Sequence, residues 1–209
     1  MLTFCPPAPC ARIAAQDEER ANEHWGVSLA GTDLSDLDLG ELRRRVVVSD
    51  AAAAIFSGTL QELIDPQSQH SREDGEQVLW VASAEDVWEA MPGGWQGRVD
   101  ERGRGLSGGQ RQRLGLARVL LMDPEVLVMV EPTSAVDAHT EARIAMRVRG
   151  WRHGRTTLVT TVSPLWLHHA DKVVLLRNGE VVAEGSHEVL LSSSPEYRDA
   201  VTRGADVVS

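Results

Sequence analysis

The clearest pattern of apolar and polar positions begins near the middle of the chain. Apolar residues recur at helical spacing over residues 107–122, and Ser107 and Gln110 form the S-x-x-Q pattern that caps the start of a helix. The next segment, residues 126–130, is apolar at every position, which is typical of a strand buried on both faces of a sheet. These residues predict a capped helix followed by a central strand.

Helices and strands continue to alternate after this strand. Asp137 can cap another helix, and residues 156–161 form the next strand candidate. Asn178-Gly179 is typical of a type I′ turn, here between strands at residues 173–176 and 180–183, and a last short helix follows. Such alternation predicts an α/β fold with a parallel sheet.

The first half of the chain is less regular. Residues 1–25 combine several prolines with a charged run and are expected to form a disordered leader. Residues 27–30 predict a short strand, 37–45 a short helix and 46–48 a buried strand. Residues 60–92 look mainly helical, and the tryptophans in this segment and just after it are expected in the core: Trp80, Trp88 and Trp95.

Composition narrows the classes of function. The 209 residues include 21 Lys and Arg against 31 Asp and Glu, and the net charge of −10 without a basic stripe makes nucleic-acid binding a poor candidate. No apolar run approaches the ~20 residues of a membrane helix, so membrane contact is expected only through a partner. Cys5 and Cys10 have no second ligand pair nearby and are interpreted as free thiols.

The segment Leu106-Ser107-Gly108-Gly109-Gln110 carries the candidate chemistry. A capped helix start presents free backbone N–H groups and the positive end of the helix dipole, and the glycines let a phosphate approach closely. An ordinary helix cap is the alternative interpretation. The residues from Gly103 to Gly108 also match the dinucleotide fingerprint G-x-G-x-x-G, but the mostly polar segment 98–102 stands where that fingerprint needs a strand.

Several motifs in order resemble the ATP-binding-cassette (ABC) ATPases of exporter type. Residues 106–113 read LSGGQRQR, like the family's signature motif, and an apolar strand and Glu131 through Asp137 follow, like its Walker B strand and D-loop. Residues 56–59, 177–180 and 184–190 are similar to the segment after the Q-loop and to the C-terminal hairpin and helix. The resemblance spans about residues 26–209.

The resemblance implies the fold class and the domain organisation. The chain is expected to be an α/β, P-loop NTPase-like ABC nucleotide-binding domain that lacks the P-loop strand and helix. Residues 26–209 would form this partial domain, with a helical subdomain at about residues 58–122, and residues 1–25 would stay unmatched.

A phosphate-binding P-loop, G-x-x-x-x-G-K-[ST], is absent from this sequence. Its lysine neutralises phosphate charge and its hydroxyl binds Mg²⁺. The only lysine is Lys172, which follows Ala170-Asp171, and the correctly spaced Gly103 and Gly108 are followed by Gly109-Gln110.

Other catalytic positions of the family are also changed. Val130 stands where the family has the aspartate that binds Mg²⁺, whereas Glu131 keeps the position of the general base. Val162 stands at the position of the switch histidine, and Ala51 near that of the Q-loop glutamine. The histidines that follow are interpreted as surface residues: His168 and His169.

In the family, two cassettes face head to tail, and each signature closes over a nucleotide held by the other's P-loop. The resemblance therefore implies that Leu106 to Gln110, with the D-loop Asp137, serve ATP bound by a partner. Glu131 would be idle, and this chain would hold no metal and would not hydrolyse ATP alone. ATP and Mg²⁺ would come with a second cassette that has an intact P-loop and with a transmembrane domain, at the cytoplasmic face of the cell membrane.

Three alternatives stay open. The chain can be a truncated, non-functional product of a full exporter gene, in which case it is expected to melt without cooperativity. An autonomous soluble ATPase would need an unrecognised phosphate loop. A cassette of the chromosome-maintenance or DNA-repair type shares the signature, but the sustained heptads of its coiled coils do not occur here.

Overall fold

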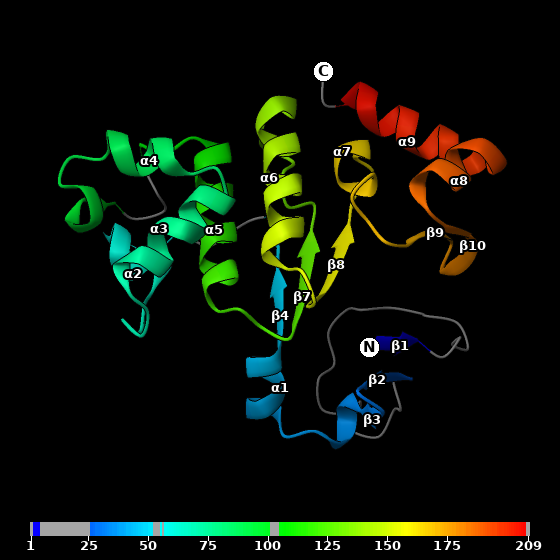
Figure 1. Cartoon of the computed structure of the whole chain (residues 1–209), viewed down its shortest axis with the longest axis horizontal. Coiled ribbons are helices and arrows are strands. Elements are labelled where there is room, and N and C mark those ends of the chain that lie inside the picture. The colour runs from blue at the N-terminus through cyan, green and yellow to red at the C-terminus, as the bar shows by residue number, and fades with distance from the viewer. Residues whose placement is uncertain (1, 5–25, 52–54, 56, 101–104, 208–209) are drawn as a thin grey trace.

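A three-stranded parallel sheet lies at the centre of the chain, whose computed structural model describes residues 2–4, 26–51, 55, 57–100 and 105–207. The strand order is β4-β7-β8, with β4 at Val46–Ser49, β7 at Val126–Val130 and β8 at Thr156–Thr160 (Figure 1). The predicted parallel pairing is confirmed for these strands.

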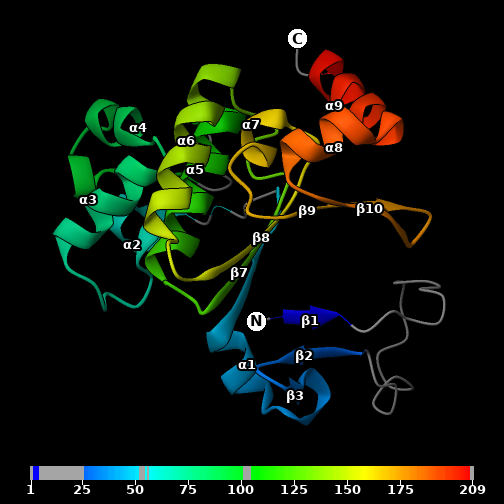
Figure 2. The same cartoon turned by 45° about the vertical axis from the view of Figure 1, so that its right-hand side comes forward.

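Two long helices cover one face of this sheet. Figure 2 shows α5 (Gly108–Leu121) and α6 (Ala138–Trp151) on the same side of the three strands. Leu127 and Met129 of β7 point to that side and are fully buried in the main hydrophobic core. The predicted caps are confirmed, because Ser107 begins α5 in a capping box and Asp137 begins α6.

The opposite face of the sheet is exposed in part, which corrects the expectation of strands buried on both sides, although Val126 at the start of β7 is buried. The exposed fraction is 63% for Val48, 36% for Val130 and 40% for Leu158. Parallel sheets normally carry helices on both faces. Here the described residues place no helix over this face, so these apolar side chains are exposed to solvent.

The helices of residues 60–92 form a second group beside the sheet (Figure 1). Trp88 and Trp95 pack against the core as expected. Trp80, in contrast, is 51% exposed, and the guanidinium carbon of Arg147 lies 4.0 Å from the centroid of its ring. The subdomain bounds 58–122 stay a prediction. The elements are β5 (Gly58–Thr59), α2 (Leu60–Ile64), α3 (Arg72–Val81), α4 (Glu85–Ala90), η2 (Gly94–Gln96) and β6 (Arg98–Val99).

The C-terminal part forms a separate hairpin and a small second core. Asn178 and Gly179 both have positive φ, which confirms the predicted turn. The second core contains Leu167, Leu190 and Tyr197, and the last helix, α9, was not foreseen. The elements are α7 (Pro164–Leu167), β9 (Val173–Arg177), β10 (Glu180–Gly185), α8 (His187–Ser193) and α9 (Pro195–Val207).

A small antiparallel sheet precedes the parallel one. It contains β1 (Leu2–Phe4), β2 (Val27–Leu29) and β3 (Thr32–Asp33), and η1 (Leu34–Asp36) and α1 (Leu39–Arg45) lead from it into β4. The expected disorder of the leader does not hold for residues 2–4, which pair with β2. Residues 5–25, with both cysteines, lie outside the described part.

Candidate functional site

The signature residues lie at the exposed start of α5. Ser107 Oγ accepts a hydrogen bond from the Gln110 N–H at 3.1 Å, and Gln110 Oε1 accepts one from the Ser107 N–H at 2.9 Å. The N–H groups of the helix's first turn, including Gly108 and Gly109, have no acceptor within the helix itself. Together with the helix dipole, this exposed turn fits a phosphate group.

The second glycine of the signature packs against the loop that follows β7. A Cβ on Gly109 would lie 2.7 Å from the carbonyl oxygen of Ala135, which is shorter than real contacts allow. At Gly108 a Cβ would meet the Ala135 Cβ at 3.6 Å and an Arg111 guanidinium nitrogen at 3.9 Å, which are ordinary contacts. The structure thus brings the predicted signature and D-loop segments into contact, and the contact explains why residue 109 is glycine.

Gln112 is a functional residue candidate that the sequence analysis did not single out. Its amide Nε2 donates to the Glu131 carbonyl oxygen at 3.0 Å and to Ser134 Oγ at 3.2 Å. Its Oε1 accepts from the Ala135 N–H at 2.9 Å, and the residue is only 5% exposed. The sequence feature that could have identified Gln112 is its place as a polar residue on the core-facing side of the amphipathic helix α5. Gln112 therefore fixes the signature helix to the end of β7.

Glu131 directly follows β7 and has a left-handed backbone, with φ at +44°. Its N–H donates to the Thr160 carbonyl at 2.9 Å, and its side chain accepts from Thr161 Oγ1 at 3.3 Å. Non-glycine residues in this conformation are strained, and such strain gathers at functional sites. The carboxylate is half-buried at the carboxyl ends of β7 and β8.

The neighbouring Val130 does not fit a magnesium site. Its side chain is apolar, and a hard cation such as Mg²⁺ requires oxygen ligands. Among the described residues, no group of three or more His, Cys, Asp or Glu side chains is arranged to hold a metal ion. The backbone N–H groups at the signature therefore fit a phosphate, whereas the side chain at residue 130 offers no oxygen ligand for Mg²⁺.

Asp137 lies at the start of α6, in the loop that touches the signature. Its carboxylate accepts from the Thr140 N–H at 2.9 Å, and this hydrogen bond is the main reason that the pKa of Asp137 is lowered. The residue is exposed and is already occupied as a helix cap. Its carboxylate stays ionised near neutral pH.

The two histidines lie in the C-terminal part. His168 is exposed and contacts Glu188, with Nδ1 at 3.1 Å from the carboxylate. His169 is half-buried, and burial is the main cause of its lowered pKa, followed by the charges of His168 and Arg149. Val162, at the position of the switch histidine, is 44% exposed.

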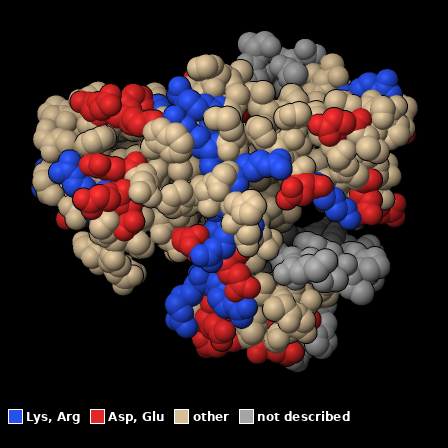
Figure 3. Space-filling model, in the orientation of Figure 1, with Lys and Arg blue, Asp and Glu red and all other residues tan. Residues whose placement is uncertain are grey.

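Three arginines tie the helices of the site to the group around α3. Arg113 of α5 donates to the Ser83 carbonyl and to Asp86, and Arg143 and Arg147 of α6 donate to Ser83 Oγ. Figure 3 shows the basic side chains over α6 beside the acidic ones over α4. The signature helix is therefore oriented by α3 and α4 as well as by the sheet.

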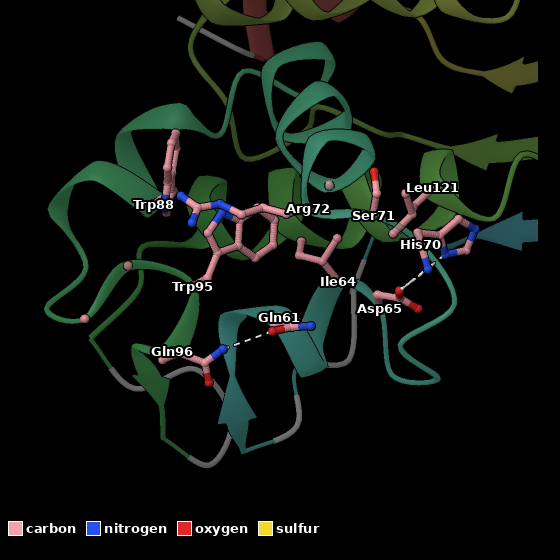
Figure 4. Close-up of a pocket in the computed structure, with 13 residues that line it drawn as sticks. Gln61, Ile64, Asp65, His70, Ser71, Arg72, Trp88, Trp95, Gln96 and Leu121 are labelled. Carbon is pink, nitrogen blue, oxygen red and sulfur yellow. Dashed lines mark hydrogen bonds and ion pairs between the residues drawn. The ribbon is translucent and has the colours of Figure 1, made fainter.

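A pocket of about 300 Å³ lies within that helical group, lined by Ile64, Trp88 and Trp95 among others (Figure 4). At its rim, His70 Nδ1 lies 3.4 Å from Asp65 Oδ2, and Gln96 donates to Gln61 at 3.0 Å. The pocket shares no lining residue with the signature. It is a feature of the packing between α2, α3 and η2.

Comparisons with known proteins agree with this geometry. The family model described as "ABC transporter" matches residues 15–134. The chain belongs to the ABC transporter family. The match begins at residue 15. It therefore includes residues 15–25, for which the sequence motifs alone indicated no counterpart in the family.

Individual relatives of this ABC domain are much longer proteins. The chain is 33% identical over 177 residues to multidrug resistance protein pgp-1 of Caenorhabditis elegans. The aligned segment covers 84% of this chain and 13% of that protein. It is 36% identical to the ABC transporter ATP-binding protein YwjA of Bacillus subtilis, over 82% of this chain and 30% of that protein. The chain therefore spans less than a third of either relative.

A solved structure supports the same fold. The structure of a bacterial Atm1-family ABC exporter with ATP bound matches with a TM-score of 0.78 and 28% identity, over 86% of this chain and 32% of that one. The chain thus has the fold of an ABC nucleotide-binding domain, and ABC domains bind ATP and Mg²⁺. Within the described residues, no helix has the length and apolar character needed to cross a bilayer.

Proposed function

We propose that this chain is the ATP-binding-cassette subunit of an exporter that contributes its signature to ATP held by a partner cassette. The observation that carries the proposal is the contrast within one site. Residues 107–110 form an exposed, capped helix start that fits a phosphate, whereas Val130 occupies the position of the metal-binding carboxylate. One half of a nucleotide site is therefore kept and the other half is changed.

The proposed partner is a second cassette with an intact P-loop, joined to a transmembrane domain. Its P-loop would bind ATP and Mg²⁺, and residues 106–110 of this chain would close over the phosphates. Asp137 would take part through the D-loop, which contacts the signature at Gly109 and Ala135. This chain would then act at the cytoplasmic face of the cell membrane through its partner, in the coupling of ATP hydrolysis to transport.

Glu131 is proposed to be idle in this chain. Its carboxylate keeps the position of a general base, but a general base needs a positioned water and a bound phosphoryl group to act upon. With no P-loop motif and with Val130 beside it, the chain alone lacks the parts that would hold them.

Equilibrium binding tests the proposal. Calorimetric titration of the chain with Mg-ATP should give no saturable binding below millimolar concentrations, and the same titration of an ABC cassette with an intact P-loop should give it. Tight, Mg²⁺-dependent binding of ATP by the chain alone would contradict the proposal.

A second candidate is an inactive product of an exporter gene, and the exposed apolar face of the sheet favours it. Such a product would lack fixed tertiary packing and would melt over a broad range of temperature. A single cooperative transition, with the same midpoint by near-UV and far-UV circular dichroism, would exclude this candidate.

A further inference from the structure

The outward side of α6 carries arginine, methionine and tryptophan side chains rather than the usual mixture of charges. Arg143, Met146 and Gly150 recur at helical spacing along the middle of this side. Ile144 and Val148 lie on the opposite side of the helix and are buried in the core. We call the outward side, with the side chains that flank it, the α6 surface: Trp80, Arg143, Met146, Arg147, Arg149 and Trp151.

Three large apolar side chains of the α6 surface are exposed. The exposed fraction is 58% for Met146, 51% for Trp80 and 36% for Trp151. Trp80 belongs to α3, and Arg147 holds it against α6 through the guanidinium over its ring while pairing with Glu85 at 2.9 Å. Trp151 follows Arg147 by one helical turn. Tryptophan is highly buried on average, so two exposed tryptophans on neighbouring helices indicate a contact surface.

The charges on the α6 surface are positive, although the whole chain has a net charge of −10. Glu141, the one carboxylate within α6, is 5% exposed. Arg143 donates to Ser83 Oγ at 3.1 Å, and in the described part of the chain it forms no ion pair with a carboxylate. The Arg149 side chain is 55% exposed and lies 3.7 Å from the Asp171 carboxylate. Figure 3 accordingly shows blue and tan atoms over α6.

This combination restricts what binds there. Tryptophan, methionine and arginine are enriched at protein interfaces, where aspartate, glutamate and lysine are depleted. A two-fold pairing with a second copy would place the surface against itself, and so arginine against arginine. A nucleic acid or an anionic bilayer carries many charges, which the net charge of −10 repels. A short acidic segment carries few, and within the Debye length of about 8 Å the nearby arginines dominate.

We propose that the α6 surface binds an acidic segment of another polypeptide, whose carboxylates pair with Arg143 and Arg149 and whose apolar side chains cover Met146 and the two tryptophans. Guanidinium groups suit this role because they bind carboxylates through two parallel hydrogen bonds. The 14 residues of α6 span about 21 Å, which sets the length of the contact. The surface excludes residues 107–110, so this contact is additional to the proposed role of the signature and does not depend on it.

A binding experiment without nucleotide tests the proposal. The probe is a fluorescein-labelled synthetic helical peptide of about 18 residues, with leucine on one face and glutamate on the other. We expect it to bind the full chain with micromolar affinity by fluorescence anisotropy. A peptide of equal charge, in which serine replaces every leucine, should bind at least about tenfold more weakly, because it lacks the apolar contact.

Variants of the chain locate the contact. Arg143→Glu and Arg149→Glu should each weaken binding of the leucine–glutamate peptide by about tenfold, because like charges then face one another. Arg198→Glu, at an exposed arginine of α9, changes the net charge equally and should bind as the unchanged chain does. Met146→Ser should weaken binding without a change of charge. Circular dichroism checks that each variant is folded.

Several results would overturn the proposal. These are no binding at about 1 mM leucine–glutamate peptide, or equal weakening by Arg198→Glu and Arg143→Glu. A dimer in analytical ultracentrifugation that Arg143→Glu dissociates would make a second copy the occupant. Co-sedimentation with phosphatidylserine vesicles that Arg143→Glu abolishes would make an anionic bilayer the occupant. Since no ATP is present, these results leave the proposed role of the signature untouched.

Discussion

Gly109 and Ala135 meet so closely that a methyl group on the glycine would lie 2.7 Å from the alanine's carbonyl oxygen. Because that oxygen belongs to the backbone of the loop after β7, it cannot move aside like the end of a flexible side chain. The signature and the loop that leads to Asp137 therefore hold one another in place.

Gly109→Ala is expected to destabilise the chain by about 1–3 kcal/mol, the usual cost of overpacking. Gly150→Ala is the matched control, since Gly150 is also helical but has nothing within 4 Å of its Cβ position. The control should stabilise the chain by about 0.5–1 kcal/mol, through helix propensity alone. Urea denaturation measures both, and a gain in stability for Gly109→Ala would show that the loop yields freely.

Gln112→Leu should cost about 1–3 kcal/mol for the polar groups that it leaves without partners. The groups are the Glu131 carbonyl and the Ala135 N–H, which Gln112 contacts at 3.0 and 2.9 Å. Gln96→Leu, which removes an exposed hydrogen bond to Gln61, should stay within about 0.5 kcal/mol of the unchanged chain. Equal effects of the two substitutions in chemical denaturation would refute a special role for Gln112.

Thr133→Val tests a buried network behind the site. Thr133 Oγ1 donates to Glu141 Oε1 and accepts from Trp166 Nε1, both at 2.8 Å. Valine keeps the shape but leaves both groups unpaired, so we expect a loss of about 2–4 kcal/mol in the free energy of unfolding. Thr202→Val, at an exposed hydroxyl, should change it by less than about 0.5 kcal/mol.

The contact between Asp86 and Arg113 predicts a dependence on pH. The hydrogen bond from Arg113 is the main cause that holds the pKa of Asp86 below its ordinary value of 3.8. A lowered folded pKa means that the contact stabilises the chain fully above pH 3.8 and that this stabilisation is lost as the pH falls through the lower folded value.

Asp86→Asn should therefore reduce stability at pH 7 by about 0.5–1 kcal/mol, a modest amount because the Asp86 side chain is 55% exposed. The difference between the two chains should shrink as the pH falls below 3.8. Urea denaturation at several pH values measures it, because urea adds no salt that would screen the contact. A difference that stays constant down to pH 2.5 would show that charge is not its source.

Local signals made much of the fold predictable. The caps at Ser107 and Asp137, the apolar run of β7 and the turn at Asn178-Gly179 each act over a few residues, and the structure confirms them. The exposure of Val48 and Trp80 was not predictable, because it depends on which elements pack over a residue rather than on the residue itself.

The candidate site was predictable in its parts but not in its connections. The motif gave the signature and Glu131 as separate segments of sequence. That Gln112 joins them, and that Gly109 touches Ala135, depends on the angle at which α5 crosses the end of β7. Such contacts come from tertiary packing, which no local pattern specifies.

ATP hydrolysis by a partner cassette tests the central proposal most directly. The partner is the cassette of YwjA with an intact P-loop and an inactivated signature, assayed alone, with this chain and with its Gly108→Asp variant. At Gly108 a side chain has ordinary contacts, so the variant should fold, while its carboxylate repels a phosphate at the helix start. We predict that only the unchanged chain restores hydrolysis and that the chain alone has none. Hydrolysis by the chain alone that Glu131→Gln abolishes, or equal stimulation by Gly108→Asp, would contradict the account.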